Sequence, residues 1–173
     1  MAGRPATPRG DHGAISSTRL ESGKYRAFAR YRRWDGRLST VTATGASEPA
    51  ARRLLEERIV SQLQIERALE GVDAASPFGD VAEAWLVELS TGATPAAVRT
   101  LEHVLRRYVL PTFQHTPINK MTADRVERFL ARALMISPDR HRFTSGVLDQ
   151  VMDFAVRNAI VSANPMIAAS GNP

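Results

Sequence analysis

The chain has 173 residues, of which 23 are Lys or Arg and 18 are Asp or Glu, giving a formal net charge of +5, and it contains no cysteine. The lack of cysteine excludes disulfides, thiolate catalysis and Cys-based zinc sites. No apolar run approaches the roughly 18 residues that span a bilayer, and the N-terminus has no apolar signal-peptide core. We therefore expect a folded cytoplasmic protein of one ordinary domain or two small ones, without a membrane partner.

Residues 1–17 are rich in Gly, Pro, Ser and Thr and carry few side chains that a core would bury. This composition predicts a flexible arm. Residues 15–21 are expected to add a short strand beside the hairpin that follows, because two strands alone are only marginally stable in water.

Residues 23–45 predict that hairpin. Two runs rich in β-branched and aromatic residues flank Asp35-Gly36, a dipeptide that suits a two-residue type I′ turn. Opposite parities along a strand point to opposite faces of the sheet. One face is therefore expected to hold Tyr25, Ala27, Ala29 and Tyr31, and the other Arg26, Phe28, Arg30 and Arg32.

The excess positive charge is concentrated around this hairpin. From Arg19 to Arg37 the net charge is +5, equal to that of the whole chain. A local basic patch is the electrostatic footprint of a polyanion binder, and a small basic sheet can lie in a DNA groove. The candidate DNA contacts are Lys24, Arg26, Arg30, Arg32, Arg33 and Arg37. The alternative is a solvated hairpin whose arginines only block pairing at the sheet edge.

A helix is predicted from an N-cap at Ser47 to about Leu69. Its apolar residues recur at helical spacing and are expected to cover the tyrosine and alanine face of the sheet; they are Ala51, Leu54, Leu55, Ile59 and Leu63. The prediction is an α+β N-terminal module over residues 18–70, with a three-stranded antiparallel sheet, one helix and an open arginine face.

Residues 71–77 show no periodicity and are predicted to be a linker to a helical domain over residues 78–173. Helix start signals recur along that domain, at Ser76-Pro77, Thr94-Pro95, Thr122 and Ser137-Pro138. An amphipathic stripe follows each signal; the second includes Tyr108 and is expected to end before Pro111, and the third ends at Leu134. With short connections, these segments predict an all-α four-helix bundle.

The order of these parts resembles the N-terminal half of tyrosine recombinases, the phage-integrase family, most closely its actinobacterial members. The resemblance covers about residues 20–168. It rests on residues 23–32 and 45–51, similar to the arm-type DNA-binding domain, and on residues 78–86, 107–111 and 155–165, similar to the core-binding domain.

The resemblance implies that the sheet enters a major groove at arm-type sites. It also implies that the helical domain, a SAM-like core-binding fold, clamps the core site with its second and fourth helices. The helical contacts carried over are Arg99, His103, Arg106, Arg140, His141, Arg142 and Ser145. Residues 78–170 hold ten basic and nine acidic residues, so these cations could instead pair with carboxylates such as Glu102, Asp149 and Asp153.

The catalytic domain of that family follows the core-binding domain and supplies an Arg, a Lys, a His-x-x-Arg pair and a tyrosine nucleophile. This chain ends at Pro173, where that domain would begin, so we expect no catalysis. His103 and Arg106 match His-x-x-Arg by letter, with Tyr108 nearby, but they lie inside the predicted second helix, and chance explains the match.

We expect no cofactor, metal or small-molecule substrate, since no phosphate loop occurs and the four histidines lack ligand spacing. The expected partners are double-stranded DNA at arm-type and core-type sites, and full-length integrase protomers that share those sites. Two alternatives stay open: a stand-alone DNA-binding regulator, or a protein-interaction module.

Overall fold

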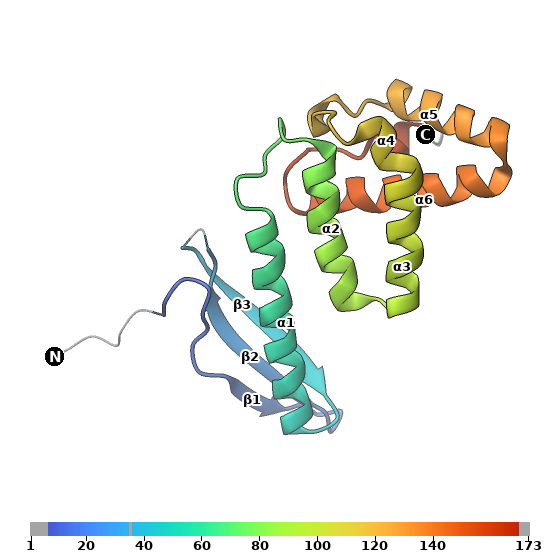
Figure 1. The fold of residues 1–173 in the computed structure, drawn as a ribbon. Helices are drawn as coiled ribbons and strands as arrows, with labels where there is room; N and C mark the ends of the chain where they lie inside the picture. Colours follow the sequence, from blue (N-terminus) through green and yellow to red (C-terminus); the bar gives the residue numbers. More distant parts are fainter. Residues whose placement is uncertain (1–6, 35, 170–173) are drawn as a thin grey trace. The chain divides into compact units, whose positions relative to one another are not determined.

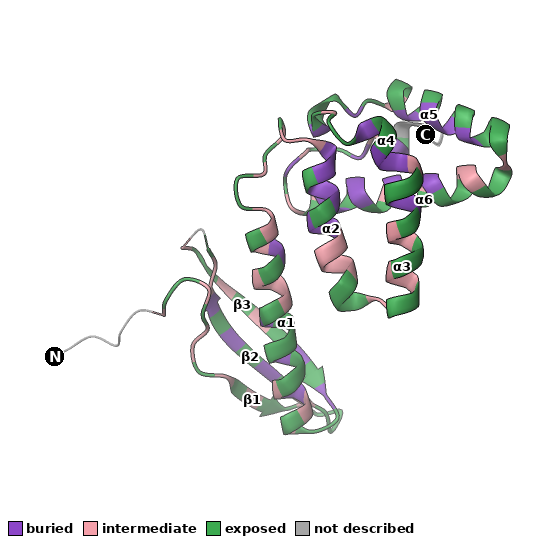
Figure 2. Cartoon of the chain, viewed as in Figure 1, coloured by how far each residue is buried: buried purple, intermediate pink, exposed green. Residues whose placement is uncertain are grey.

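The computed structural model describes residues 7–34 and 36–169. The chain divides into two compact units, Met1–Ala68 and Leu69–Pro173 (Figure 1). Each unit has its own buried core, as the purple positions in Figure 2 show.

The first unit is a three-stranded antiparallel sheet in the order β1-β2-β3, covered on one face by a helix. Its elements are β1 (Ser16–Arg19), β2 (Tyr25–Arg32), β3 (Leu38–Gly45) and α1 (Glu48–Ala68). The predicted N-cap is confirmed, because the Ser47 hydroxyl accepts the backbone N–H of Ala50 at 3.3 Å. The observed order of elements, three strands and then one helix, is the predicted β-β-β-α order.

Buried and exposed residues alternate along β2, as the parity predicted (Figure 2). Ala27, Ala29 and Tyr31 are buried beneath α1, together with Ala43 of β3 and with helix residues Ala51, Leu55 and Ile59. Leu54, predicted to belong to this core, is instead 38% exposed, because it lies about 100° around α1 from Leu55, at the edge of the face that packs on the sheet. The small side chains of the strands let the helix approach closely.

Both hairpins of the sheet use the same turn. The N–H of Gly23 donates to the carbonyl of Leu20, and the N–H of Gly36 donates to the carbonyl of Arg33, at 2.9 and 3.0 Å. Both glycines have a positive φ, +78° and +87°. In each loop three residues lie between the residues that close it, because the N–H of Leu20 donates to the carbonyl of Lys24 and the N–H of Arg33 to that of Arg37. The predicted two-residue type I′ turn is wrong; Asp35 itself lies outside the described residues.

Residues 8–17, predicted as part of a flexible arm, instead run along β2. The N–H groups of Gly10 and Gly13 donate to the carbonyls of Arg32 and Arg30, both at 2.8 Å, and the N–H of Arg32 donates to Asp11. These hydrogen bonds satisfy backbone groups at the edge of β2 that β1, which begins at Ser16, does not reach. Residues 1–6 of the predicted arm lie outside the described part of the chain.

The second unit is helical. Its main helices are α2 (Phe78–Gly92), α3 (Pro95–Val104), α5 (Ala123–Ile136) and α6 (Pro138–Arg157). Shorter segments join them: a π-helical turn η1 (Leu105–Val109), α4 (Leu110–Phe113), a 3-10 turn η2 (Ile118–Lys120) and α7 (Pro165–Ala169). The four longest helices correspond to the four predicted ones.

Three of the four predicted helix starts are confirmed by side-chain caps, at Thr94, Thr122 and Ser137. Ser76 does not cap α2, because its hydroxyl bonds with Asp73. The first N–H groups of α2 donate instead to the carbonyls of Thr116 and Gln114. Leu134, predicted to be buried, is 52% exposed near the end of α5.

The second predicted helix does not end before Pro111 but continues through it to Phe113. Proline has no N–H and crowds the carbonyl four residues earlier, which an α-helix does not tolerate well. The π-helical turn solves this, since the N–H of Leu110 donates to the carbonyl of Leu105, five residues back. Among the described residues, no helix is both long and apolar enough to span a membrane.

Replacing Gly45 by Ala should destabilise the first unit by about 1–3 kcal/mol. The added Cβ would lie 2.6 Å from the backbone nitrogen of Ala51, where α1 begins. Hydrogen exchange of the β2 amides measures this, with the α6 amides as an internal reference. Gly146→Ala is the matched control: nothing lies within 4 Å of its added Cβ in α6, so the second unit should gain about 0.5–1 kcal/mol. Unchanged β2 exchange in Gly45→Ala would contradict the close packing.

Candidate nucleic-acid interface

The face of the sheet opposite α1, hereafter the outer face, combines cations, hydroxyls and two apolar side chains. The strand register places its residues in cross-strand rows. They are Ser16, Thr18, Arg26, Phe28, Arg30, Arg32, Leu38, Thr40, Thr42 and Thr44. All but Arg32 are exposed.

Arg26 and Arg30 are the exposed cations of β2, and Lys24 is exposed just before the strand begins. Among the described residues, no carboxylate forms an ion pair with any of these three. Their positive ends are therefore available to an anion that approaches the outer face.

Arg32 and Arg37 lie at the hairpin turn. Arg32 is half-buried; its Nε donates to the carbonyl of Gly36 at 3.1 Å and its Nη1 to the carbonyl of Thr7 at 3.4 Å. This guanidinium braces the turn against residues 7–14. Arg37 is exposed, and its carbonyl accepts the N–H of Arg33 at 2.9 Å.

Arg33 belongs to a different arrangement, around the carboxylate of Glu66 in α1. The Glu66 side chain is only 7% exposed, and the Arg33 Nε lies 2.9 Å from its Oε1. The Tyr31 hydroxyl donates to the same oxygen at 3.1 Å, and the Trp34 N–H donates to Oε2 at 3.3 Å. Burial, and then the Glu66 charge, raise the pKa of the Tyr31 phenol. Arg33 thus fastens the hairpin to the helix.

In the second unit, the predicted contacts of α3 and α6 meet around Tyr108. Arg140 of α6 lies over the Tyr108 ring, 4.6 Å from its centroid, and His103 meets the same ring edge-on at 6.1 Å. Arg99, His103 and Phe143 line a shallow pocket beside it. Tyr108, placed on the buried stripe by its spacing, is half-buried.

Ion pairs occupy two of the predicted helical contacts. Arg106 reaches α2, with its Nη1 2.8 Å from Glu83 and its Nε 2.8 Å from Glu102. The hydrogen bonds to these carboxylates raise the pKa of Arg106. Arg142 pairs with Asp139 at 3.2 Å and lies over Phe143. The two remaining predicted contacts, His141 and Ser145, are half-buried on α6.

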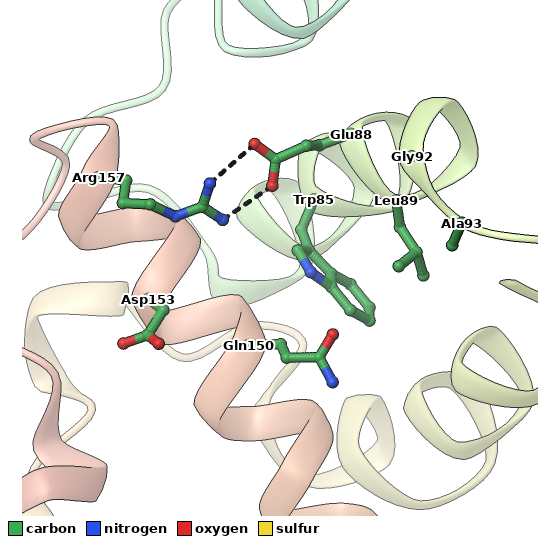
Figure 3. A pocket seen from close by; sticks show the side chains of 8 residues that line it. All are labelled: Trp85, Glu88, Leu89, Gly92, Ala93, Gln150, Asp153 and Arg157. Atoms are coloured by element: carbon green, nitrogen blue, oxygen red, sulfur yellow. Dashed lines mark hydrogen bonds and ion pairs between the residues drawn. The ribbon is translucent and has the colours of Figure 1, made fainter. Parts of the chain in front are cut away.

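Other surface carboxylates of this unit also have structural partners. Asp149 and Asp153 accept hydrogen bonds from the buried amide of Asn164, at 2.9 and 2.6 Å. Arg157 of α6 forms a bidentate pair with Glu88 of α2 at the rim of a pocket that Trp85 lines (Figure 3). These contacts join α6 to α2 and to the C-terminal turn.

His103 and Arg106, which match His-x-x-Arg by letter, contact different partners. Arg106 is held by the carboxylates of α2 and α3, whereas His103 contacts Tyr108. In the described ranges, no three His, Asp or Glu side chains gather closely enough to hold a metal ion.

The charge is divided unequally between the units. Residues 1–68 carry 13 basic and seven acidic residues, and residues 69–173 carry ten basic and 11 acidic ones. The positive field thus belongs to the unit that contains the sheet.

Comparison with known proteins shows the family of the chain. The family model of the phage integrase central domain matches residues 78–172, more than half of the chain. The chain belongs to the phage integrase family. It is also similar to prophage integrase IntZ of Escherichia coli (strain K12), with 25% identity over 152 residues. That similarity covers 80% of this integrase-family chain and 38% of the length of IntZ. No solved structure matches.

Sequence reasoning missed two parts of the interface. The first is the role of Glu66, whose partners lie 32–35 residues away in the chain. No local pattern signals such a distant pair. The second is the exposure of Leu38, 61%, at the end of the outer face. By contrast, the parity of β2 placed Phe28 among the arginines and was the signal for its exposure.

Arg33→Ala should destabilise the first unit by about 1–3 kcal/mol, because it leaves the buried Glu66 carboxylate without its cation. Faster hydrogen exchange of the β2 and β3 amides, with α6 unchanged, is the expected result. Arg30→Ala, on the outer face of the same strand, should change exchange by less than about 0.5 kcal/mol. Equal effects of the two variants would contradict the structural role of Arg33.

Proposed function

We propose that this chain binds duplex DNA during site-specific recombination, with the outer face in a major groove of arm-type sites and the helical unit on the core site. One observation carries the proposal. Arg26 and Arg30 are exposed on the outer face without a carboxylate partner among the described residues, while the neighbouring Arg33 is neutralised by Glu66. A face that keeps its cations available is suited to a polyanion.

The dimensions of the sheet support groove binding. Neighbouring strands lie about 4.8 Å apart, so three strands span about 10 Å between the outer strand axes. The major groove of B-DNA is about 12 Å wide and admits β-structure. Arginine and the Ser and Thr hydroxyls of the outer face are the side chains that contact phosphates and base edges there.

The helical unit contributes a second proposed surface, composed of Arg99, His103 and Arg140. The Arg140 guanidinium lies over the Tyr108 ring, and Tyr108 lines the same pocket as Arg99 and His103 of α3. We leave Arg106 and Arg142 out of this surface, because both are paired with carboxylates. The near-neutral charge of the unit means that this surface acts through a few placed contacts and not through a broad field.

In this proposal the chain holds DNA without breaking it. Arg106 pairs with Glu83 and Glu102, whereas His103 contacts Tyr108, so we assign none of these three side chains a part in strand cleavage. A chain that occupies attachment sites without cleaving them would compete with full-length integrase protomers, and it could also repress transcription by occupancy.

A second candidate function is a protein-interaction module. It is favoured by three consecutive exposed apolar residues at the end of α5, Leu134, Met135 and Ile136. Exposed apolar clusters mark protein interfaces more often than nucleic-acid surfaces. Such a module would show neither salt-dependent binding nor a preference for a DNA sequence.

The double variant Arg26→Ala/Arg30→Ala should weaken duplex binding about tenfold or more at low salt and flatten the log–log salt dependence by about 1.8, since two phosphate contacts would be lost. Fluorescence anisotropy with a duplex pool of random sequence measures both quantities. The charge-matched control is Arg53→Ala/Arg67→Ala, which removes two exposed cations from α1. Equal weakening by the two double variants would mean that net charge alone acts, and would contradict the outer-face interface.

Arg99→Ala/Arg140→Ala should weaken binding to duplexes that carry a core-type site, while leaving binding to arm-type duplexes unchanged. The reason is that these side chains belong to the helical unit alone. Arg125→Ala/Arg132→Ala, on the exposed side of α5, is the charge-matched control and should leave both affinities nearly unchanged. Loss of binding to both duplexes in Arg99→Ala/Arg140→Ala would contradict the assignment of these side chains to the core-type site.

A further inference from the structure

The centre of the outer face is apolar. Phe28 occupies the middle of β2, between Arg26 and Arg30, and remains 40% exposed. Across the sheet it lies opposite Ser16 of β1 and Thr42 of β3. Because Phe28 points away from α1, the core of the first unit does not explain an aromatic residue at this position.

Beside Phe28 the outer face is hollowed. The hollow is lined by Ser16, Phe28, Arg30, Leu38 and Thr40, among others. Leu38, at 61% exposure, adds a second apolar side chain to it. The guanidinium groups of Arg30 and Arg32 and the hydroxyls of Ser16 and Thr40 thus share this hollow with apolar side chains, which differs from a surface that only attracts phosphates.

The apolar group that the major groove offers is the C5-methyl of thymine, which Phe and Thr methyl groups contact. We propose that Phe28, with the neighbouring Thr42, reads a thymine methyl, so that the outer face selects DNA with an A·T pair between two contacts made by Arg26 and Arg30. This inference rests on the proposed groove binding and adds a sequence preference to it.

The spacing of residues along β2 sets where that A·T base pair lies in the bound duplex. Arg30 follows Arg26 by four residue steps, which correspond to about 13 Å of strand. One base pair advances the duplex axis by about 3.4 Å, so the two arginines span about four base pairs. Phe28 lies midway and would contact a thymine about two base pairs from the contact of each arginine.

The test begins by selecting duplexes from a pool with a random central segment, using the whole chain. Each enriched thymine of the best duplex is then replaced in turn by deoxyuridine, which keeps base pairing and removes only the methyl group. We expect a three- to fivefold loss of wild-type affinity at one position or two adjacent positions, roughly the effect of exposing one buried methyl. Phe28→Ala should bind the thymine and deoxyuridine duplexes equally.

Leu54→Ala is the matched control, since Leu54 is a similarly exposed apolar residue, 38%, on α1. This variant should keep the full thymine preference, and hydrogen exchange of the β2 amides should show both variants folded. If wild-type protein binds duplexes but no deoxyuridine substitution weakens binding, or if Phe28→Ala keeps the preference, the thymine reading is wrong although groove binding stands. If no duplex is retained at low salt, the proposed function itself fails.

Discussion

The pleat of β2 places every second side chain beneath α1, and only small or apolar side chains fit at that distance. Ala27 and Ala29 let the helix approach, and Gly45 lets it begin directly above the end of β3. A charged side chain at these positions would lose its hydration without a partner. The same alternation therefore builds the core and gathers Arg26 and Arg30 on the opposite face. Both the packing of the core and the proposed DNA binding therefore depend on the alternation of side chains along β2.

This dependence explains which parts of the fold the sequence could predict. The parity of β2, the α1 cap at Ser47 and the caps at Thr94, Thr122 and Ser137 follow from neighbours a few residues apart. The errors involve distant groups. Backbone hydrogen bonds between residues 10–13 and β2 hold residues 8–17 of the predicted arm against the strand, and the carbonyls of Gln114 and Thr116 replace Ser76 at the start of α2. Local preferences do not reveal partners that only the folded chain brings near.

Carboxylates that form ion pairs determine which of the predicted cationic side chains remain available to bind DNA. Glu66 forms an ion pair with Arg33, and Glu83 and Glu102 form ion pairs with Arg106. The Arg142–Asp139 pair, three residues apart on one helix, could have been anticipated from the sequence. The Glu102–Arg106 pair, four residues apart, could likewise have been anticipated, whereas the Arg33–Glu66 and Arg106–Glu83 pairs join residues far apart in the chain and could not. What remains on the outer face is a smaller set of cations than the composition suggested, arranged around an aromatic side chain.

The π-helical turn at Leu105–Val109 has an effect on side-chain direction that extends beyond the accommodation of Pro111. Such a turn contains one residue more than an α-helical turn, and each residue of an α-helix rotates the next side chain by about 100°. Tyr108 lies within this turn, so the extra residue helps to set the direction of its ring, and the Arg140 guanidinium lies over that ring. The backbone geometry that accommodates Pro111 therefore also affects where the Tyr108 ring points and where the Arg140 guanidinium of α6 lies.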